Sequence, residues 1–188
     1  MCSMPISAPE ARVATPLVVA FVDLSSFAAD ARRVCDEARL ADIVDAYYER
    51  LATAVQGAGG RVVKYMGDGA LLAFPTERAD DAVLALLAAK RDTDAWLAGE
   101  RWDSRLVVKV HTGSVIAGPF GARDDKRFDV IGDAVNVAAR LQTRSFAMSA
   151  ETFRLLSPEA RKAFKKHTPP ITYIPLEAAH PSNLAKWG

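Results

Sequence analysis

The chain alternates between short apolar runs and longer segments with helical periodicity. Residues 17–23, LVVAFVD, form a continuous apolar run rich in β-branched residues, which is typical of a buried central strand. From Leu40 to Val55 the apolar residues recur at steps of three and four, and Gly57 follows as a stop signal. The first part of the chain therefore predicts a strand followed by an amphipathic helix.

The middle of the chain predicts a hairpin, a second helix and another strand. The strands are expected at residues 61–66, 70–74 and 105–113, and the helix at residues 75–98. This order is that of a split βαβ unit, in which the first and third strands are antiparallel neighbours. We predict an α/β (α+β) fold with a ferredoxin-like βαββαβ core, extra helices and a carboxyl-terminal strand segment.

Composition narrows the possible partners and surroundings of the 188-residue chain. Lys and Arg number 24 against 23 Asp and Glu, so the net charge of +1 gives no reason to expect a nucleic-acid partner. Cys2 and Cys35 have neither metal-site nor disulfide spacing, which favours a reducing, cytoplasmic location. The longest apolar run, residues 82–89, is far shorter than the roughly 18 residues of a membrane span. We therefore expect no membrane segment in this chain.

Two carboxylates are predicted to converge at one end of the sheet. Asp23 ends the first strand and Asp68 occupies the tip of the hairpin, where the third strand begins. Taken singly, Asp23 also suits a helix N-cap and Asp68 a tight turn. Ionised carboxylates about 5 Å apart repel by roughly 3 kcal/mol at an effective dielectric constant near 20, and a divalent cation removes that cost. Oxygen ligands suit Mg²⁺ or Mn²⁺, with substrate phosphates completing the coordination.

The segment after Asp23 turns from strand into helix, so backbone N–H groups near Ser25, Ser26 and Phe27 are candidates for binding an anion. A third segment, residues 127–141, places Asn136 and Arg140 four residues apart on one helical face. An isolated pair at this spacing is also consistent with a solvated face. His111 and Trp96 could also suggest functional roles, but both are interpreted as structural residues.

Three motifs, FVDLSSF, KYMGDG and RFDVIGDAVNVAARL, together resemble the class III nucleotidyl cyclase catalytic domain over roughly Val18 to Leu141. The resemblance implies that Asp23 and Asp68 hold two divalent cations, Mg²⁺ or Mn²⁺, with a backbone carbonyl of Leu24. Ser26 and Phe27, whose N–H groups are candidates for binding an anion, are expected to contact substrate. The resemblance also implies that Asn136 and Arg140 orient the ribose and stabilise the α-phosphoryl group. On this basis we expect residues 1–15 to be a flexible tail and residues 16–188 the catalytic domain.

The implied reaction is the metal-dependent cyclisation of ATP to 3′,5′-cyclic AMP with release of pyrophosphate, in a head-to-tail homodimer with shared active sites. In the resembling family a Lys and an Asp at the positions of Lys64 and Asp129 select adenine, whose N1 acceptor and N6 donor match an ammonium and a carboxylate. A plain surface ion pair is the alternative for these two residues.

Several alternatives remain open at the level of the whole reaction. They are a guanylyl cyclase and a catalytically silent cyclase-like domain, although no site position appears lost. A diguanylate cyclase would require a Gly-Gly-Asp/Glu-Glu-Phe turn where this chain has Met-Gly-Asp-Gly-Ala. The carboxyl-terminal third lacks the family's Val-Lys-Gly-like segment, so the residue that holds the β- and γ-phosphates is left among four candidates: Arg105, Lys109, Lys165 and Lys166.

Overall fold

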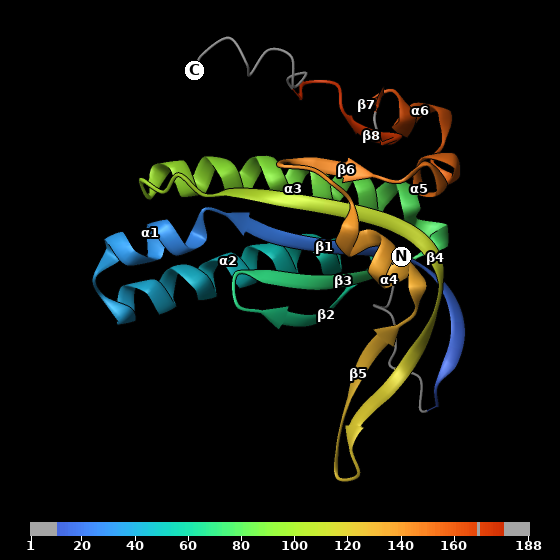
Figure 1. Cartoon of the computed structure of the whole chain (residues 1–188), viewed down its shortest axis with the longest axis horizontal. Helices are drawn as coiled ribbons and strands as arrows, with labels where there is room; N and C mark the ends of the chain where they lie inside the picture. The colour runs from blue at the N-terminus through green and yellow to red at the C-terminus, as the bar shows by residue number, and fades with distance from the viewer. Residues whose placement is uncertain (1–10, 169, 179–188) are drawn as a thin grey trace.

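The computed structural model describes residues 11–168 and 170–178, which form one mixed sheet flanked by helices (Figure 1). The strands are β1 (Val13–Ser25), β2 (Arg61–Met66), β3 (Gly69–Pro75), β4 (Arg105–Ala122), β5 (Asp125–Ile131), β6 (Phe146–Met148), β7 (Phe164–His167) and β8 (Thr172–Pro175). The helices are α1 (Phe27–Val34), α2 (Glu37–Gly57), α3 (Ala79–Gly99), α4 (Asp133–Arg140), α5 (Ala150–Leu155) and α6 (Pro158–Arg161), and a 3-10 turn (Thr76–Arg78) precedes α3.

The predicted ferredoxin-like core is confirmed by the strand order, β2-β3-β1-β4-β6-β8-β7, with β5 paired to β4. β1 lies between β3 and β4 and is antiparallel to both. The predicted antiparallel contact between the first and third strands is therefore correct. The strands β6, β8 and β7 extend the sheet beyond β4, where a single carboxyl-terminal strand segment was expected.

Alternate residues of β1 serve two separate apolar layers. Val18, Ala20 and Val22 pack with α2 and α3 on one face of the sheet. Leu17 and Val19 face the other side, where the short helix α4 covers the sheet. Because side chains alternate along a strand, Asp23 follows the second set and projects on the α4 side.

Several boundaries differ from the predicted ones. β1 begins at Val13 rather than at residue 17, so residues 13–15 of the predicted tail belong to the sheet, while residues 1–10, with Cys2, lie outside the described residues. A separate helix, α1, precedes α2, whose N-cap Asp36 accepts hydrogen bonds from the backbone of Ala38 and Arg39. Cys35 at the break is exposed and is a free thiol.

The largest departure from prediction is an arm formed by β4 and β5, which projects from the body of the molecule (Figure 1). The sequence predicts a strand at residues 105–113, whereas β4 continues to Ala122. Gly113 provides room for α4, since a Cβ atom there would lie 2.8 Å from the Cβ of Ala134. Among the described residues, no helix is both long and apolar enough to cross a membrane.

Candidate active site

The acid pair, Asp23 and Asp68, is brought together by the antiparallel contact of β1 and β3. Val22 pairs with Ala70, which places the turn before β3 beside the end of β1. A Cβ atom at Gly69 would lie 3.0 Å from the Val22 carbonyl oxygen and 3.4 Å from Asp23 Oδ1, so a larger residue would require the end of β1 to shift by a few tenths of an ångström. The structure thus places the two carboxylates within hydrogen-bonding reach of each other.

The surroundings of Asp23 disfavour its charged form. Burial raises the pKa of Asp23 most, and the charge and hydrogen bond of Asp68 raise it further. The backbone N–H of Leu24 and the positive charge of Lys109 act in the opposite direction and lower this pKa. A cation between the carboxylates would favour ionisation of both. Within residues 11–168 and 170–178, no group of three or more His, Cys, Asp or Glu side chains is placed to hold a metal, so the acid pair is a two-carboxylate site.

A cleft of about 230 Å³ adjoins Asp23, and Lys109 lines it together with Met66, Gly69 and Ala139. The Lys109 ammonium donates a hydrogen bond to the Ala139 carbonyl at 3.1 Å.

The other three basic candidates have different surroundings. The Arg105 guanidinium donates to the carbonyls of Trp102 and Ser104, and the Lys165 ammonium to those of Leu176 and Ala178. Lys166 is exposed on β7, away from the residues that line this cleft. Of the four candidates, Lys109 alone lines the cleft beside Asp23.

Three tyrosines lie near the hairpin: Tyr47 and Tyr48 of α2, and Tyr65 of β2. In the sequence they only fit the helix and strand patterns. Tyr48 of α2 donates a hydrogen bond to the carbonyl of Gly67 at 2.5 Å, and its ring stacks on that of Tyr65 at 3.9 Å. The hydroxyl of Tyr65 donates back to the Tyr48 carbonyl at 3.2 Å. The hairpin turn that carries Asp68 is therefore fastened to α2. In the sequence, Tyr48 only continues the helical pattern of α2, so nothing there indicates this contact.

Tyr47, the neighbour of Tyr48, lies fully buried beneath the acid pair. Its hydroxyl has no hydrogen-bond partner among the described residues. Burial raises the pKa of Tyr47, and the negative charges of Asp23 and Asp68 raise it further. The hydroxyl therefore stays protonated and is a potential donor close to the two carboxylates.

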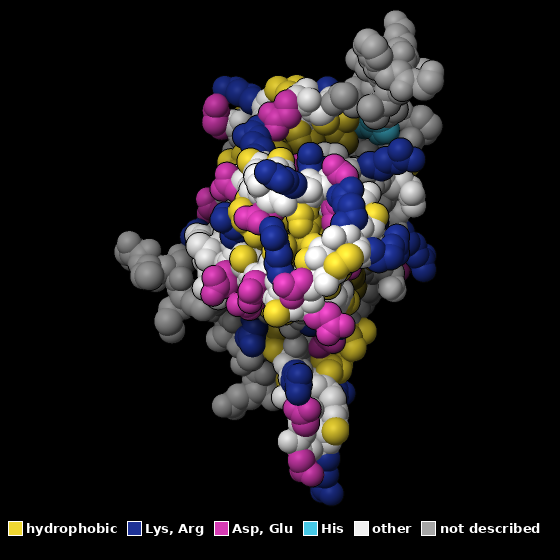
Figure 2. All heavy atoms as spheres, turned by 90° about the vertical axis from the view of Figure 1, so that its left-hand side faces the viewer, with side chains coloured by type: hydrophobic (Ala, Val, Ile, Leu, Met, Phe, Trp, Pro, Cys, Tyr) yellow, Lys and Arg dark blue, Asp and Glu magenta, His cyan; other side chains and the backbone are white. Residues whose placement is uncertain are grey.

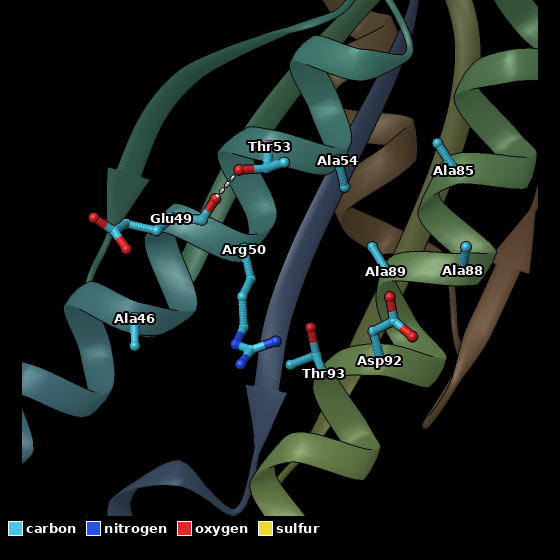
Figure 3. Close-up of a pocket in the computed structure, with 10 residues that line it drawn as sticks. All are labelled: Ala46, Glu49, Arg50, Thr53, Ala54, Ala85, Ala88, Ala89, Asp92 and Thr93. Atoms are coloured by element: carbon cyan, nitrogen blue, oxygen red, sulfur yellow. Dashed lines mark hydrogen bonds between the residues drawn. The ribbon is translucent and has the colours of Figure 1, made fainter.

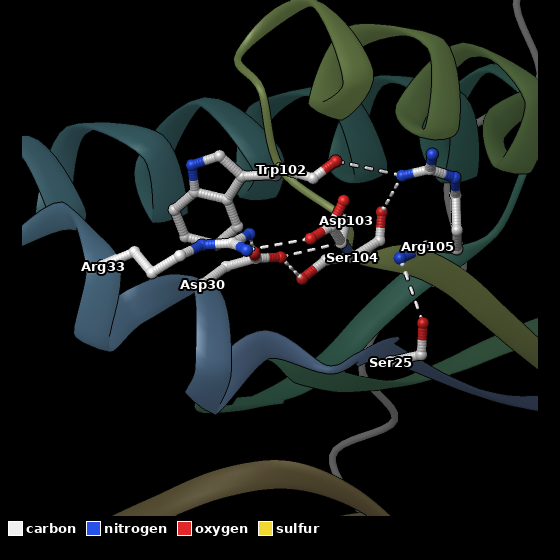
Figure 4. A network of polar contacts seen from close by, with 7 residues as sticks. All are labelled: Ser25, Asp30, Arg33, Trp102, Asp103, Ser104 and Arg105. Carbon is white, nitrogen blue, oxygen red and sulfur yellow. Dashed lines mark hydrogen bonds and ion pairs between the residues drawn. The ribbon is translucent and has the colours of Figure 1, made fainter.

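The turn from β1 into α1 has an unusual backbone conformation. Ser26, the N-cap of α1, has φ 62°, and its side chain makes no capping hydrogen bond. Left-handed conformations cost a non-glycine residue about 1 kcal/mol or more, and such strain is common at functional sites. The hydroxyl of the preceding residue, Ser25, accepts a hydrogen bond from the backbone N–H of Arg105 at 3.1 Å (Figure 4).

The residues predicted to act on ribose and base are not among those that line the cleft beside Asp23. Asn136 and Arg140 are exposed on α4, whose buried face consists of Ala134 and Ala138. Their side chains make no hydrogen bond or ion pair within the described part of the chain.

Lys64 and Asp129 join β2 to β5 through an ion pair of 2.6 Å, which is the alternative that the sequence left open for them. The side chains remain 45% and 23% exposed, so both are still accessible to a ligand.

A larger cavity, of about 560 Å³, lies between α2 and α3 (Figure 3). Alanines make up half of its lining, and the Arg50 side chain extends between the two helices (Figure 3). None of the predicted site residues lines it, so its size alone does not make it the active site.

Comparison with models of known protein families gives a match over most of the chain. A model described as the adenylate and guanylate cyclase catalytic domain matches residues 10–174. Adenylate cyclase 2 of Rhizobium meliloti (strain 1021) is 29% identical over 154 residues, which are 75% of this chain and 42% of that protein. The chain thus spans less than half of the length of this relative.

Solved structures share the fold. The adenylyl cyclase CyaB from P. aeruginosa superposes with a TM-score of 0.76 at 20% identity, over 90% of this chain and 98% of that one. The guanylyl cyclase Cya2 superposes with a TM-score of 0.74 at 18% identity, over 92% and 97% of the respective chains. At these identities the likeness concerns the fold alone.

Proposed function

The chain belongs to the adenylate and guanylate cyclase catalytic domain family, and from this premise we propose that it is an adenylate cyclase, which converts ATP to 3′,5′-cyclic AMP and pyrophosphate. The observation that carries the proposal is the convergence of Asp23 and Asp68 beside the turn into α1. This convergence supports a site at one end of the sheet in which proposed metal ligands lie next to proposed phosphate ligands.

Divalent cations, Mg²⁺ or Mn²⁺, would be held by Asp23, Asp68 and the backbone carbonyl of Leu24. This donor set fits such ions because it consists of oxygen atoms, and because a positive charge relieves the repulsion that raises the pKa of Asp23. When bound, the cations supply charge neutralisation of the triphosphate and a lower pKa for the ribose 3′-hydroxyl.

The chain's own groups bind and orient the nucleotide. The N–H groups of Ser26 and Phe27, at the start of α1, donate to phosphate oxygens, and the Lys109 ammonium supplies positive charge in the adjoining cleft. Asn136 orients the ribose, and Arg140 stabilises the charge that develops on the α-phosphoryl group.

In the reaction the 3′-oxygen releases its proton to solvent and forms a bond to the α-phosphorus, while the bond from that phosphorus to the oxygen shared with the β-phosphorus breaks, and pyrophosphate leaves with that oxygen. No protein nucleophile takes part.

Adenine is the proposed base because Lys64 and Asp129 offer one donor and one acceptor. The two side chains already lie together, so a base that inserts between them exchanges one ion pair for two hydrogen bonds. Guanine, with N1–H and O6, meets each of them with the wrong polarity. Guanylyl cyclase activity is the second candidate, because the matched family comprises both adenylate and guanylate cyclases.

The proposed assembly is a head-to-tail homodimer in which each active site combines the acid pair of one chain with Lys64, Asp129, Asn136 and Arg140 of the other. Ile116 and Ile131, which pair across the β4–β5 arm, are 41% and 52% exposed and offer apolar surface for a second copy.

The direct test is incubation of the full chain with ATP or GTP in Mn²⁺, followed by chromatographic separation of the products. We expect 3′,5′-cyclic AMP and pyrophosphate in equal amounts from ATP. Formation of cyclic GMP alone would show that the base is guanine rather than adenine. No cyclic product from either nucleotide would favour a catalytically silent domain.

A further inference from the structure

The only buried residue of α1 is a carboxylate. Asp30 is 2% exposed, whereas a short helix of this kind is normally held by an apolar face. The apolar contacts of α1 come from Phe27 and Val34, which are partly buried against the core, with the Phe27 ring 5.7 Å from the ring of Trp102. Because the one fully buried side chain of α1 is polar, the position of the helix also depends on what Asp30 binds.

Asp30 binds the segment that leads into β4 (Figure 4). Its Oδ2 accepts hydrogen bonds from the backbone N–H of Ser104, at 2.8 Å, and from the Ser104 hydroxyl. Its Oδ1 accepts from the guanidinium of Arg33, which also donates to Asp103 at 2.9 Å. The buried charge is thus paired and its acceptor capacity is used, as a buried carboxylate requires.

The contacts of Asp30 are continuous with those of the proposed phosphate-binding turn. Ser104, which is itself fully buried, is followed by Arg105, whose N–H donates to Ser25. Two successive residues before and at the start of β4 therefore hold α1 and the turn ahead of it. The N-cap of α1 contributes no such restraint, because Ser26 makes no side-chain capping bond.

We infer that Asp30 is a positioning residue for triphosphate binding: through Ser104 it fixes the turn of residues 24–27 relative to β4, which carries Lys109. The inference rests on the proposed function, because the bond from Ser104 to Asp30 affects nucleotide binding only if this turn binds the triphosphate. Asp30 does not touch the substrate and acts through the backbone that does.

The test compares Asp30→Asn and Ser104→Ala with Asp103→Asn. Asparagine keeps the size of Asp30, but its amide nitrogen cannot accept, so either Ser104 or Arg33 loses its acceptor. Asp103→Asn makes the same chemical change at the exposed end of the network, where only Arg33 is affected. Binding is measured by calorimetry with 3′-deoxy-ATP and Mn²⁺, because this nucleotide lacks the attacking hydroxyl; kcat and KM for ATP and the Tm are measured in parallel.

We expect Asp30→Asn to raise the Kd for 3′-deoxy-ATP and the KM for ATP about tenfold, which corresponds to about 1.4 kcal/mol, with less than a threefold change in kcat. Ser104→Ala should give a smaller change in the same direction, and the double variant should be no weaker than Asp30→Asn alone. Asp103→Asn should match the unmodified protein.

An unchanged Kd and KM in a folded Asp30→Asn protein would overturn the inference, even if the Tm falls, because the residue would then be structural only. If that variant does not fold, Ser104→Ala, which keeps the ion pair with Arg33, decides by the same criterion. Failure of the unmodified protein to bind 3′-deoxy-ATP would instead remove the proposed function and this role with it. Binding by the unmodified protein with no effect of either variant removes the positioning role alone.

Discussion

At the scale of single residues, Asp23 works against the stability of the folded chain. Its pKa is raised by burial and by Asp68, so the folded state holds the proton of Asp23 more tightly than the unfolded state does. The stability contributed by this group is therefore present below the unfolded pKa, near 4, and is lost as the pH rises through the higher folded pKa. A residue that destabilises the fold at neutral pH is more readily explained by ligand binding than by packing.

The first prediction concerns the acid pair. Asp23→Ala and Asp68→Ala should each retain less than a tenth of the activity at saturating Mn²⁺, because each removes a ligand that the other carboxylate does not replace; a tenfold loss is about 1.4 kcal/mol. Asp23→Asn should also show an equal or higher Tm than the unmodified protein at pH 7 without divalent cations, since the repulsion is gone.

Asp124→Ala, in the turn between β4 and β5, is the matched control and should leave activity and Tm unchanged. More than a tenth of the activity in either Ala variant would show that the metal assignment is wrong. A clear fall in Tm for Asp23→Asn would show that Asp23 has a stabilising, structural role.

The second prediction concerns the base. The unmodified protein should prefer ATP over GTP by at least about 10-fold in kcat/KM, because guanine would leave polar groups unpaired at about 1–3 kcal/mol each. Lys64→Glu combined with Asp129→Cys should erode that preference, as measured from initial rates with each nucleotide. The same exchange at the exposed ion pair of Arg127 and Asp125, also on β5, serves as the control and should preserve it. Equal kcat/KM values for the two nucleotides in the unmodified protein would contradict the adenine assignment and leave the cyclase proposal intact.

At the scale of elements, the hairpin of β2 and β3 owes its position to α2 as well as to β1. The hydroxyls of Tyr48 and Tyr65 form reciprocal bonds between α2 and the hairpin, next to the turn with Asp68. Such a tether restricts the turn before any ligand binds, which lowers the cost of ordering it afterwards.

The third prediction tests this tether. Tyr48→Phe keeps the ring stack but removes the donor to Gly67, a bond worth about 0.5–1.5 kcal/mol, so the Mn²⁺ concentration for half-maximal activity should rise about 3- to 10-fold with kcat at saturation little changed. Tyr65→Phe, which removes the other bond and leaves Gly67 bonded, is the control and should have the smaller effect on the Mn²⁺ dependence. An identical Mn²⁺ dependence in Tyr48→Phe and the unmodified protein would show that the tether is not needed for metal binding.

The elements also show what the sequence can and cannot predict. The convergence of Asp23 and Asp68 was predictable because strand topology determines which strand ends meet. The bond from Ser104 to Asp30 was not, because it joins residues 74 positions apart and a single Asp on a helix gives no sign of its partner. The arm of β4 and β5 was not predicted for a related reason. The close approach of Gly113 to α4, within a strand that continues to Ala122, exists only in the folded chain.

At the scale of the whole molecule, charges of both signs balance, since 24 Lys and Arg face 23 Asp and Glu in the sequence. On the end that includes α1, Figure 2 shows Lys and Arg side chains interspersed with Asp and Glu. The fold class was predictable, because it follows from the order of elements, whereas assembly depends on surfaces that no single-chain pattern describes.

The last prediction concerns assembly. If each active site combines the acid pair of one chain with Asn136 of the other, a mixture of Asp23→Ala and Asn136→Ala should recover activity although each variant alone is nearly inactive. With equal amounts and free exchange, half of the dimers are mixed and each has one intact site of two, so about a quarter of the unmodified activity should return. A mixture of Asp23→Ala and Asp68→Ala is the matched control, because both changes strike the acid pair and no mixed dimer contains an intact one. Subunit exchange is followed independently by native mass spectrometry with one variant isotopically labelled. Exchange without recovery in the first mixture, or recovery in the second, would show that the active site is not shared in this way.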